Sequence, residues 1–117
     1  MPAGRGSDET GPREPGRLTI DYHPAASAEL IEAGRFYEER CVGLGRAFLD
    51  AVDTALTTLR RNPLLGWSDA RGRRRWLIQR FPYLIIYRIE GAVLHLLAVA
   101  HTSRKPDYWD SRDTGNR

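Results

Sequence analysis

The stretch YLIIYRIEGAVLHLLAVA, residues 83–100, carries the strongest structural signal in the chain. It contains two nearly continuous apolar runs, and Glu90-Gly91 between them is the natural turn. Such runs are typical of central strands that a second layer covers on at least one face. Residues 73–81 read as a preceding strand, which Phe81-Pro82 separates from the next one. Successive short strands with tight turns predict an antiparallel meander.

Upstream of these strands, apolar residues recur at helical spacing. Residues 25–41 form one apolar stripe, and residues 44–61 form a second whose opposite side is polar. Gly43 and Gly45 interrupt the pattern, and so short a connection predicts an antiparallel helical hairpin. Asn62-Pro63 ends the second helix, because the residue before a proline avoids the helical region.

The N-terminal part completes the expected architecture. The alternating segment Leu18–His23 predicts a short strand that Pro24 ends, and His23 is placed to cap the first helix. The order is therefore β-α-α-β-β-β, an α+β two-layer domain with a helical hairpin packed on an antiparallel sheet. We expect a flexible leader over residues 1–17, the domain over 18–110 and a frayed tail over 111–117.

Composition narrows the possible functions. The chain has 117 residues, 41% of them hydrophobic and 28% charged, which is typical of one soluble globular domain. It contains neither an apolar run of about 18 residues nor a secretory signal pattern, so we expect a cytoplasmic protein with no membrane partner. A single cysteine, Cys41, excludes a disulfide framework within the chain, and three scattered histidines do not predict a metal site. No cofactor is expected.

Charge is unevenly distributed behind the net value of +3. Residues 60–80 carry seven arginines against Asp69 alone, a local charge of +6. Residues 25–59 carry three arginines against six carboxylates, a local charge of −3. The basic block either meets phosphate or an acidic protein segment, or is a solvated arginine-rich loop, and charge alone leaves both interpretations open. Trp67 and Trp76 flank the arginine-rich loop within this block and are expected chiefly to anchor it by packing.

Three sequence blocks are the most specific features of the chain. They are LRRNPLLG at residues 59–66, RFPYLIIYR at residues 80–88 and VAHTSRKPDYW at residues 99–109. Their order and spacing, together with the expected element order, resemble the ParE/RelE superfamily of toxins from type II toxin–antitoxin systems. The resemblance extends from about Leu18 to Trp109.

The resemblance implies a small bacterial toxin that forms a hetero-oligomer with a cognate antitoxin. In that superfamily the antitoxin's C-terminal part wraps the toxin and often lays a helix or an added strand into its surface grooves. ParE-like members inhibit DNA gyrase, whereas RelE-like members cut mRNA in the ribosome without a metal. A diverged member that retains only antitoxin binding is a third interpretation. The expected partner-binding residues are Arg73, Arg74, Arg75, Trp76 and Trp109.

The RNA-cleaving activity would require catalytic residues, which a gyrase inhibitor would not need. Cleavage of RNA by its own 2′-OH needs a base, an acid and cations around the phosphate. Arg80 and Arg104 would then hold the phosphate, His101 would transfer the proton, and Tyr108 would position or donate. Each of these residues also has a structural alternative. His101 would cap the end of its strand, and Arg104 would pair with an acid such as Asp107 or fix the C-terminal residues. Tyr108, with Trp109, would cover the edge of the core.

Two features favour the ParE-like branch. The Phe-Pro-Tyr turn and the His-x-x-Arg-x-Pro-x-x-Trp tail resemble ParE-like members more than mRNA-cleaving ones. The second helix also lacks the lysine cluster of several ribosome-dependent members, since Lys105 is the only lysine of the chain. Arginine can replace lysine as a phosphate clamp, although the two are not equivalent. The favoured interpretation is a protein-binding inhibitor of gyrase that is not an enzyme.

Overall fold

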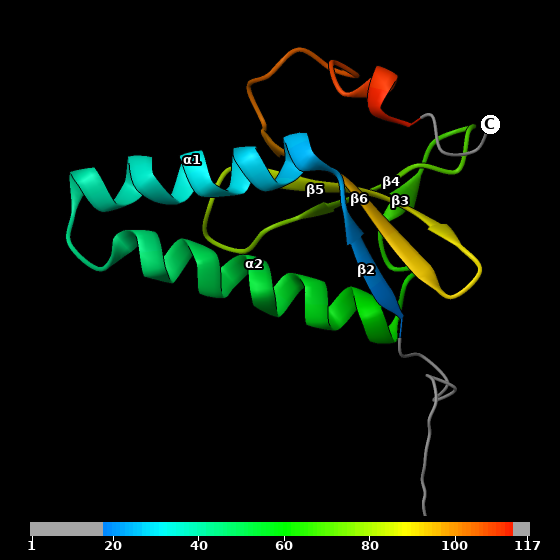
Figure 1. Cartoon of the computed structure of the whole chain (residues 1–117), viewed down its shortest axis with the longest axis horizontal. Coiled ribbons are helices and arrows are strands. Elements are labelled where there is room, and N and C mark those ends of the chain that lie inside the picture. The colour runs from blue at the N-terminus through cyan, green and yellow to red at the C-terminus, as the bar shows by residue number, and fades with distance from the viewer. Residues whose placement is uncertain (1–17, 114–117) are drawn as a thin grey trace, which may run out of the picture.

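The computed structural model describes residues 18–113, so the expected leader and residues 114–117 lie outside the described part (Figure 1). The predicted two-layer α+β architecture is confirmed, with the helical hairpin packed on a five-stranded sheet. Among the described residues, no helix is both long and apolar enough to cross a membrane. The elements in chain order are β2 (Thr19–Tyr22), α1 (Pro24–Arg40), α2 (Leu44–Arg61), β3 (Trp67–Ser68), β4 (Arg74–Leu77), β5 (Tyr83–Glu90), β6 (Val93–His101) and the 3-10 helix η2 (Asp110–Arg112).

The sheet has the strand order β2-β6-β5-β4-β3. Strands β4, β5 and β6 form the predicted antiparallel meander, and the two-residue strand β3 extends it. β2 lies parallel to β6, with Thr19 opposite Val93 and Tyr22 opposite Leu96, so the sheet is mixed and not wholly antiparallel. Only strands joined by a tight turn have to be antiparallel, and β2 is joined to the rest through the helical layer.

The first strand of the meander is shorter than predicted. It ends at Leu77, because Arg80 adopts a left-handed conformation with φ 72° and the chain turns there. The N–H of Ile78 donates to the carbonyl of Tyr83 at 2.9 Å and closes this turn. The β4–β5 turn is therefore longer than Phe81-Pro82 alone.

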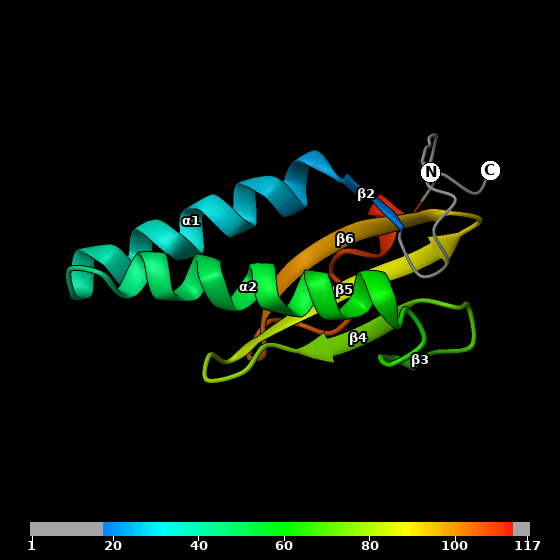
Figure 2. The ribbon, with the colours of Figure 1, turned by 90° about the horizontal axis from the view of Figure 1, so that it is seen from below.

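The core lies between the hairpin and one face of the sheet, as Figure 2 shows from below. The predicted apolar stripe of α2 is buried there against β5 and β6. An aromatic cluster of Tyr37, Phe48, Phe81 and Tyr83 closes one end, with Phe48 at 5.2 Å from Phe81 and 5.1 Å from Tyr83 between ring centroids. At this end the two helices extend past the sheet.

Local hydrogen bonds fix both ends of α1. His23 Nδ1 accepts the N–H of Ala25 at 3.0 Å, so the expected cap is confirmed. At the other end, the Glu38 carboxylate accepts the N–H groups of Gly43 and Gly45, at 3.1 Å and 3.0 Å. These N–H groups at the start of α2 would otherwise have no partner within the helix. The connection between the helices is thereby held in one conformation.

Replacing Gly45 by alanine is expected to lower the free energy of unfolding by about 1–3 kcal/mol, the range for overpacking. A Cβ at Gly45 would lie 2.5 Å from the Gly34 carbonyl oxygen, so the helices would have to separate. Gly34→Ala is the matched control, because its Cβ would lie 3.4 Å from the flexible Leu49 side chain. Urea unfolding of both variants measures the difference. Equal stabilities would show that the hairpin separates without cost.

The second face of the sheet is covered by the C-terminal segment, residues 102–113, drawn from orange to red in Figure 1. The described structure thus continues past the expected domain end at residue 110. Trp109 is only 2% exposed and packs with Ile86, Leu97 and Ala98. Ion pairs connect the segment to other elements: Arg112 with Glu29 of α1, Asp110 with Arg73, Asp107 with Arg75 of β4, and Asp113 with Arg88 of β5.

Candidate functional site

Three of the four predicted RNA-cleaving residues lie together at the end of β6. His101 is the last residue of β6, and Arg104 and Tyr108 follow it in the C-terminal segment. The Arg104 guanidinium lies over the Tyr108 ring, 3.8 Å from its centroid. A cavity of about 250 Å³ opens between α1 and this end of β6. Its lining includes Glu29, Glu32, Phe36, Tyr83, His101 and Arg104.

Glu29 of α1 connects this cavity to the C-terminal segment. Its carboxylate accepts the Tyr108 hydroxyl at 2.7 Å and two Arg112 N–H groups at 3.0 Å and 2.9 Å. It also accepts the N–H of Val99 at 3.0 Å. Burial raises the pKa of Glu29, but these hydrogen bonds and the charge of Arg112 outweigh it, so the pKa lies below its ordinary value. The carboxylate is therefore ionised at neutral pH.

Tyr108 and His101 are held by their own hydrogen bonds. Burial, with the hydrogen bond to Glu29, raises the pKa of Tyr108 to about 12, so the phenol keeps its proton. His101 Nδ1 accepts the N–H of Ser103 at 3.0 Å, and its ring packs edge-on against Tyr83. This contact matches the interpretation of His101 as a strand cap.

The Glu29 network already engages two of the polar groups beside this cavity. An RNA phosphate in the cavity would meet the ionised Glu29, and the nearby cation Arg112 is already paired with that carboxylate. The Tyr108 proton is already donated to Glu29. Among the described residues, no group of three or more His, Cys, Asp or Glu side chains is arranged to hold a metal ion.

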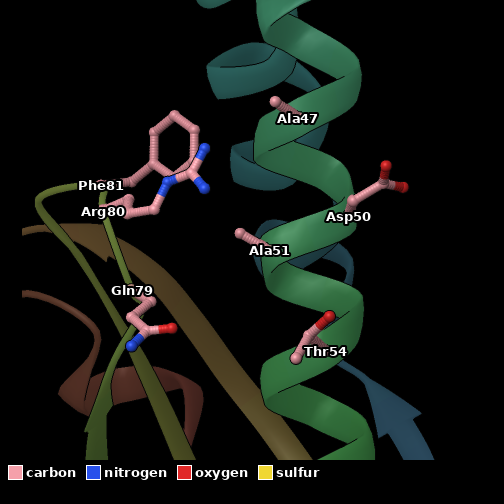
Figure 3. Close-up of a pocket in the computed structure, with 7 residues that line it drawn as sticks. All are labelled: Ala47, Asp50, Ala51, Thr54, Gln79, Arg80 and Phe81. Carbon is pink, nitrogen blue, oxygen red and sulfur yellow. The ribbon is translucent and has the colours of Figure 1, made fainter.

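Arg80 lies at a different place, in the β4–β5 turn. It lines a second cavity of about 340 Å³ against α2, which shares no lining residue with the first (Figure 3). Its side chain extends toward α2, whereas Asp50 on that helix points away from it. The four predicted residues therefore do not form one constellation.

Part of the basic block forms ion pairs within the molecule. The Arg73 guanidinium is buried, pairs with Asp69 at 3.0 Å and with Asp110, and lies over the Trp109 ring. Although burial lowers the pKa of Arg73, its hydrogen bonds to Asp110 and Asp69 leave that pKa raised. Arg75 pairs with Asp69 and Asp107. Asp110 and Asp107 thus offset two of the six net positive charges of the block.

The remaining expected partner-binding residues divide between interior and surface. Trp76 packs against the core, and the buried Trp109 offers almost no surface to a partner. Arg74 donates to the carbonyls of Leu64 and Gly66, at 3.1 Å and 2.6 Å. Trp67 is 57% exposed, so packing anchors the block through Trp76 and not through Trp67.

Comparisons with known proteins agree with this fold. A family model described as "ParE toxin of type II toxin-antitoxin system, parDE" matches residues 20–106. A solved structure titled "Chromosomal ParDE TA system from P. aeruginosa" has a TM-score of 0.62 and 18% sequence identity, and covers 74% of this chain and 97% of that one. At this identity the likeness shows the fold alone. Among curated proteins, no match was found. Because the family model spans most of the described domain, the chain belongs to the ParE toxin family of type II toxin–antitoxin systems.

Proposed function

We propose that this ParE-family toxin arrests growth by inhibiting DNA gyrase through protein binding, and that a cognate antitoxin neutralises it in a hetero-oligomer. Family membership supports both parts, and the similar solved structure is titled as a ParDE system. Both proposed partners are intracellular, so the proposal includes a cytoplasmic location.

The observation that carries the choice of a binding inhibitor is the Glu29 network. An ionised carboxylate lies among the residues that RNA cleavage would need, and it already holds the proton donor Tyr108 and the cation Arg112. The fourth residue, Arg80, lines another cavity. The proposal therefore treats His101, Arg104 and Tyr108 as parts of a recognition surface and not as catalytic groups.

A supercoiling and plasmid-linearisation assay with purified toxin and gyrase tests this proposal. We expect lost supercoiling or trapped cleavage, and we expect the antitoxin to reverse it at near-equal amounts. Gyrase that stays active at high toxin excess, together with cutting of ribosome-bound mRNA, would contradict the proposal and favour the RelE-type alternative.

Expression in cells separates an active toxin from a diverged one. We expect growth to stop when the toxin is expressed alone and to continue when the antitoxin is co-expressed. Normal growth at a verified level of soluble toxin would contradict an active toxin and favour a member that only binds its antitoxin.

A further inference from the structure

A third cavity, of about 310 Å³, lies on the second face of the sheet beside the C-terminal segment. The strand register places Trp67 on this face. Trp67 lies opposite Arg75, and Arg75 lies opposite Ile86. Side chains directly opposite each other on antiparallel strands share a face, and Ile86 packs with Trp109 on the second face. This cavity, the Trp67 cavity, is therefore separated from the helical hairpin by the sheet.

The Trp67 cavity has an apolar floor and an aromatic wall. Leu84 and Ile86 of β5 and Ala100 of β6 line it from the sheet. Trp67 lines it from β3, and residues 104–109 line it from the C-terminal segment. Its volume is at the lower end of the range for pockets that hold small ligands. It therefore has room for a large side chain of a partner, but not for a whole helix.

Trp67 remains open to solvent although it lines the cavity. It is 57% exposed, and it is the largest apolar side chain exposed among residues 18–113. Exposed apolar patches mark interaction sites, and tryptophan is enriched among the residues that carry most of the energy of protein–protein binding. A partner side chain in the cavity would remove both Trp67 and the floor from water.

The charges at the cavity favour an acidic partner. In the described part of the chain, neither Arg104 nor Lys105 pairs with a carboxylate, and both are exposed. The carboxylate that lines the cavity, Asp107, is paired with Arg75 at 3.1 Å. A second copy of the chain would bring like charges together here, whereas a segment with carboxylates would be attracted.

The residues of the proposed recognition surface meet at this cavity. His101, Arg104 and Tyr108 all line it. The 250 Å³ cavity next to α1 shares His101 and Arg104 but is also lined by Glu29 and Glu32, which would repel an acidic segment. The Trp67 cavity is therefore the better place for an acidic partner to anchor.

We propose that the Trp67 cavity is the anchor site for gyrase, and that it takes a large apolar side chain from an acidic segment of that enzyme. The side chain lies between Trp67 and the floor at Leu84 and Ala100, and a neighbouring carboxylate pairs with Lys105. Burial of the apolar groups supplies affinity, and the exposed cations speed association. The identity of the partner rests on the proposed function.

Variants that open or fill the cavity test the inference by titration with purified gyrase. Trp67→Ala removes the aromatic wall, so we expect binding to weaken about 30-fold or more, as at an interface hot spot. Ala100→Phe fills the cavity from its floor and is expected to have the same effect. Leu64→Ala is the control, because Leu64 is also exposed but does not line the cavity, and we expect a loss of less than about threefold. Circular dichroism verifies that each variant is folded.

A charge reversal tests the acidic character of the partner. We expect Lys105→Glu to weaken gyrase binding about tenfold and to make binding less sensitive to salt. Arg46→Glu is the matched control, because it changes the net charge equally on α2, in the other layer, and we expect a loss of less than about threefold. Equal losses in the two variants would overturn the acidic partner, since net charge alone would explain them.

Oxidative footprinting of the wild-type toxin gives a measurement that needs no variant. We expect gyrase to protect Trp67 strongly from hydroxyl radicals. Ile31 on α1, which is also exposed, should be oxidised as in the free toxin. In a separate titration, Trp67→Ala should bind the antitoxin within about threefold of the wild type.

The outcomes separate the anchor site from the proposed function. Unprotected Trp67 in a saturated gyrase complex would overturn the anchor site and leave gyrase inhibition intact. A folded Trp67→Ala that loses antitoxin affinity would also overturn it and assign the cavity to the antitoxin. A wild-type toxin that leaves gyrase active would instead refute the proposed function, and with it the partner of this cavity.

Discussion

Replacing Trp109 by alanine is expected to lower the free energy of unfolding by about 3–5 kcal/mol, the range for large aromatic residues in cores. The indole is 2% exposed and packs on the second face of the sheet against Ile86 and Leu97. It also covers the Arg73 guanidinium, which lies 4.7 Å from its ring centroid. The substitution would leave a cavity and expose the buried guanidinium of Arg73 to water. Urea unfolding at neutral pH measures the loss.

Trp67 provides the control within the same chain. It is 57% exposed, so Trp67→Ala is expected to change the free energy of unfolding by less than about 1 kcal/mol. A comparable loss in both variants would contradict the assignment of Trp109 as the residue that holds the C-terminal segment in place.

Replacing Glu29 by glutamine is expected to lower the free energy of unfolding by about 3 kcal/mol. The change leaves the half-buried Arg112 without its counter-charge and weakens the bond from Tyr108. Glu32→Gln is the matched control, because that side chain is 76% exposed and its ion pair with Arg35 is solvated. Adding Arg112→Met to Glu29→Gln is expected to recover part of the loss, since it removes the unpaired charge. No recovery would contradict this explanation.

The same residue predicts a dependence on pH. Because the folded pKa of Glu29 lies below its ordinary value of 4.5, its contribution is present above about that pH and is lost as the pH falls through the folded pKa. The stability of the wild type should therefore fall more steeply below pH 4.5 than that of Glu29→Gln. Urea unfolding of both at neutral and acid pH checks this. A constant difference between them across that range would contradict it.

Local patterns in the sequence were enough for most of the fold. The apolar runs in residues 83–100 and the two helical stripes depend on neighbouring residues only, so periodicity reveals them. The parallel pairing of β2 was missed, because the choice of partner strand depends on contacts across the whole chain. The early end of β4 was missed for another reason. It depends on the left-handed conformation of Arg80, which its sequence context does not signal.

The candidate site was also only partly predictable from the sequence. His101, Arg104 and Tyr108 could be grouped because they follow one strand within a few residues. Glu29 and Arg112 could not, because they bond across 83 residues and Glu29 resembles the other polar residues of α1. The ion pairs of Arg73 and Arg75 could not be predicted either, since their partners Asp110 and Asp107 come from the C-terminal segment.

The ion pairs of the C-terminal segment also set an order of assembly. Glu29 is synthesised early and its partner Arg112 late, so the carboxylate has no counter-charge while the intervening chain is being made. The arginines that pair with Asp107, Asp110 and Asp113 are likewise synthesised before these aspartates. During translation the second face of the sheet stays uncovered until these residues emerge. The fold of the toxin is therefore completed only after residues 102–113 have left the ribosome.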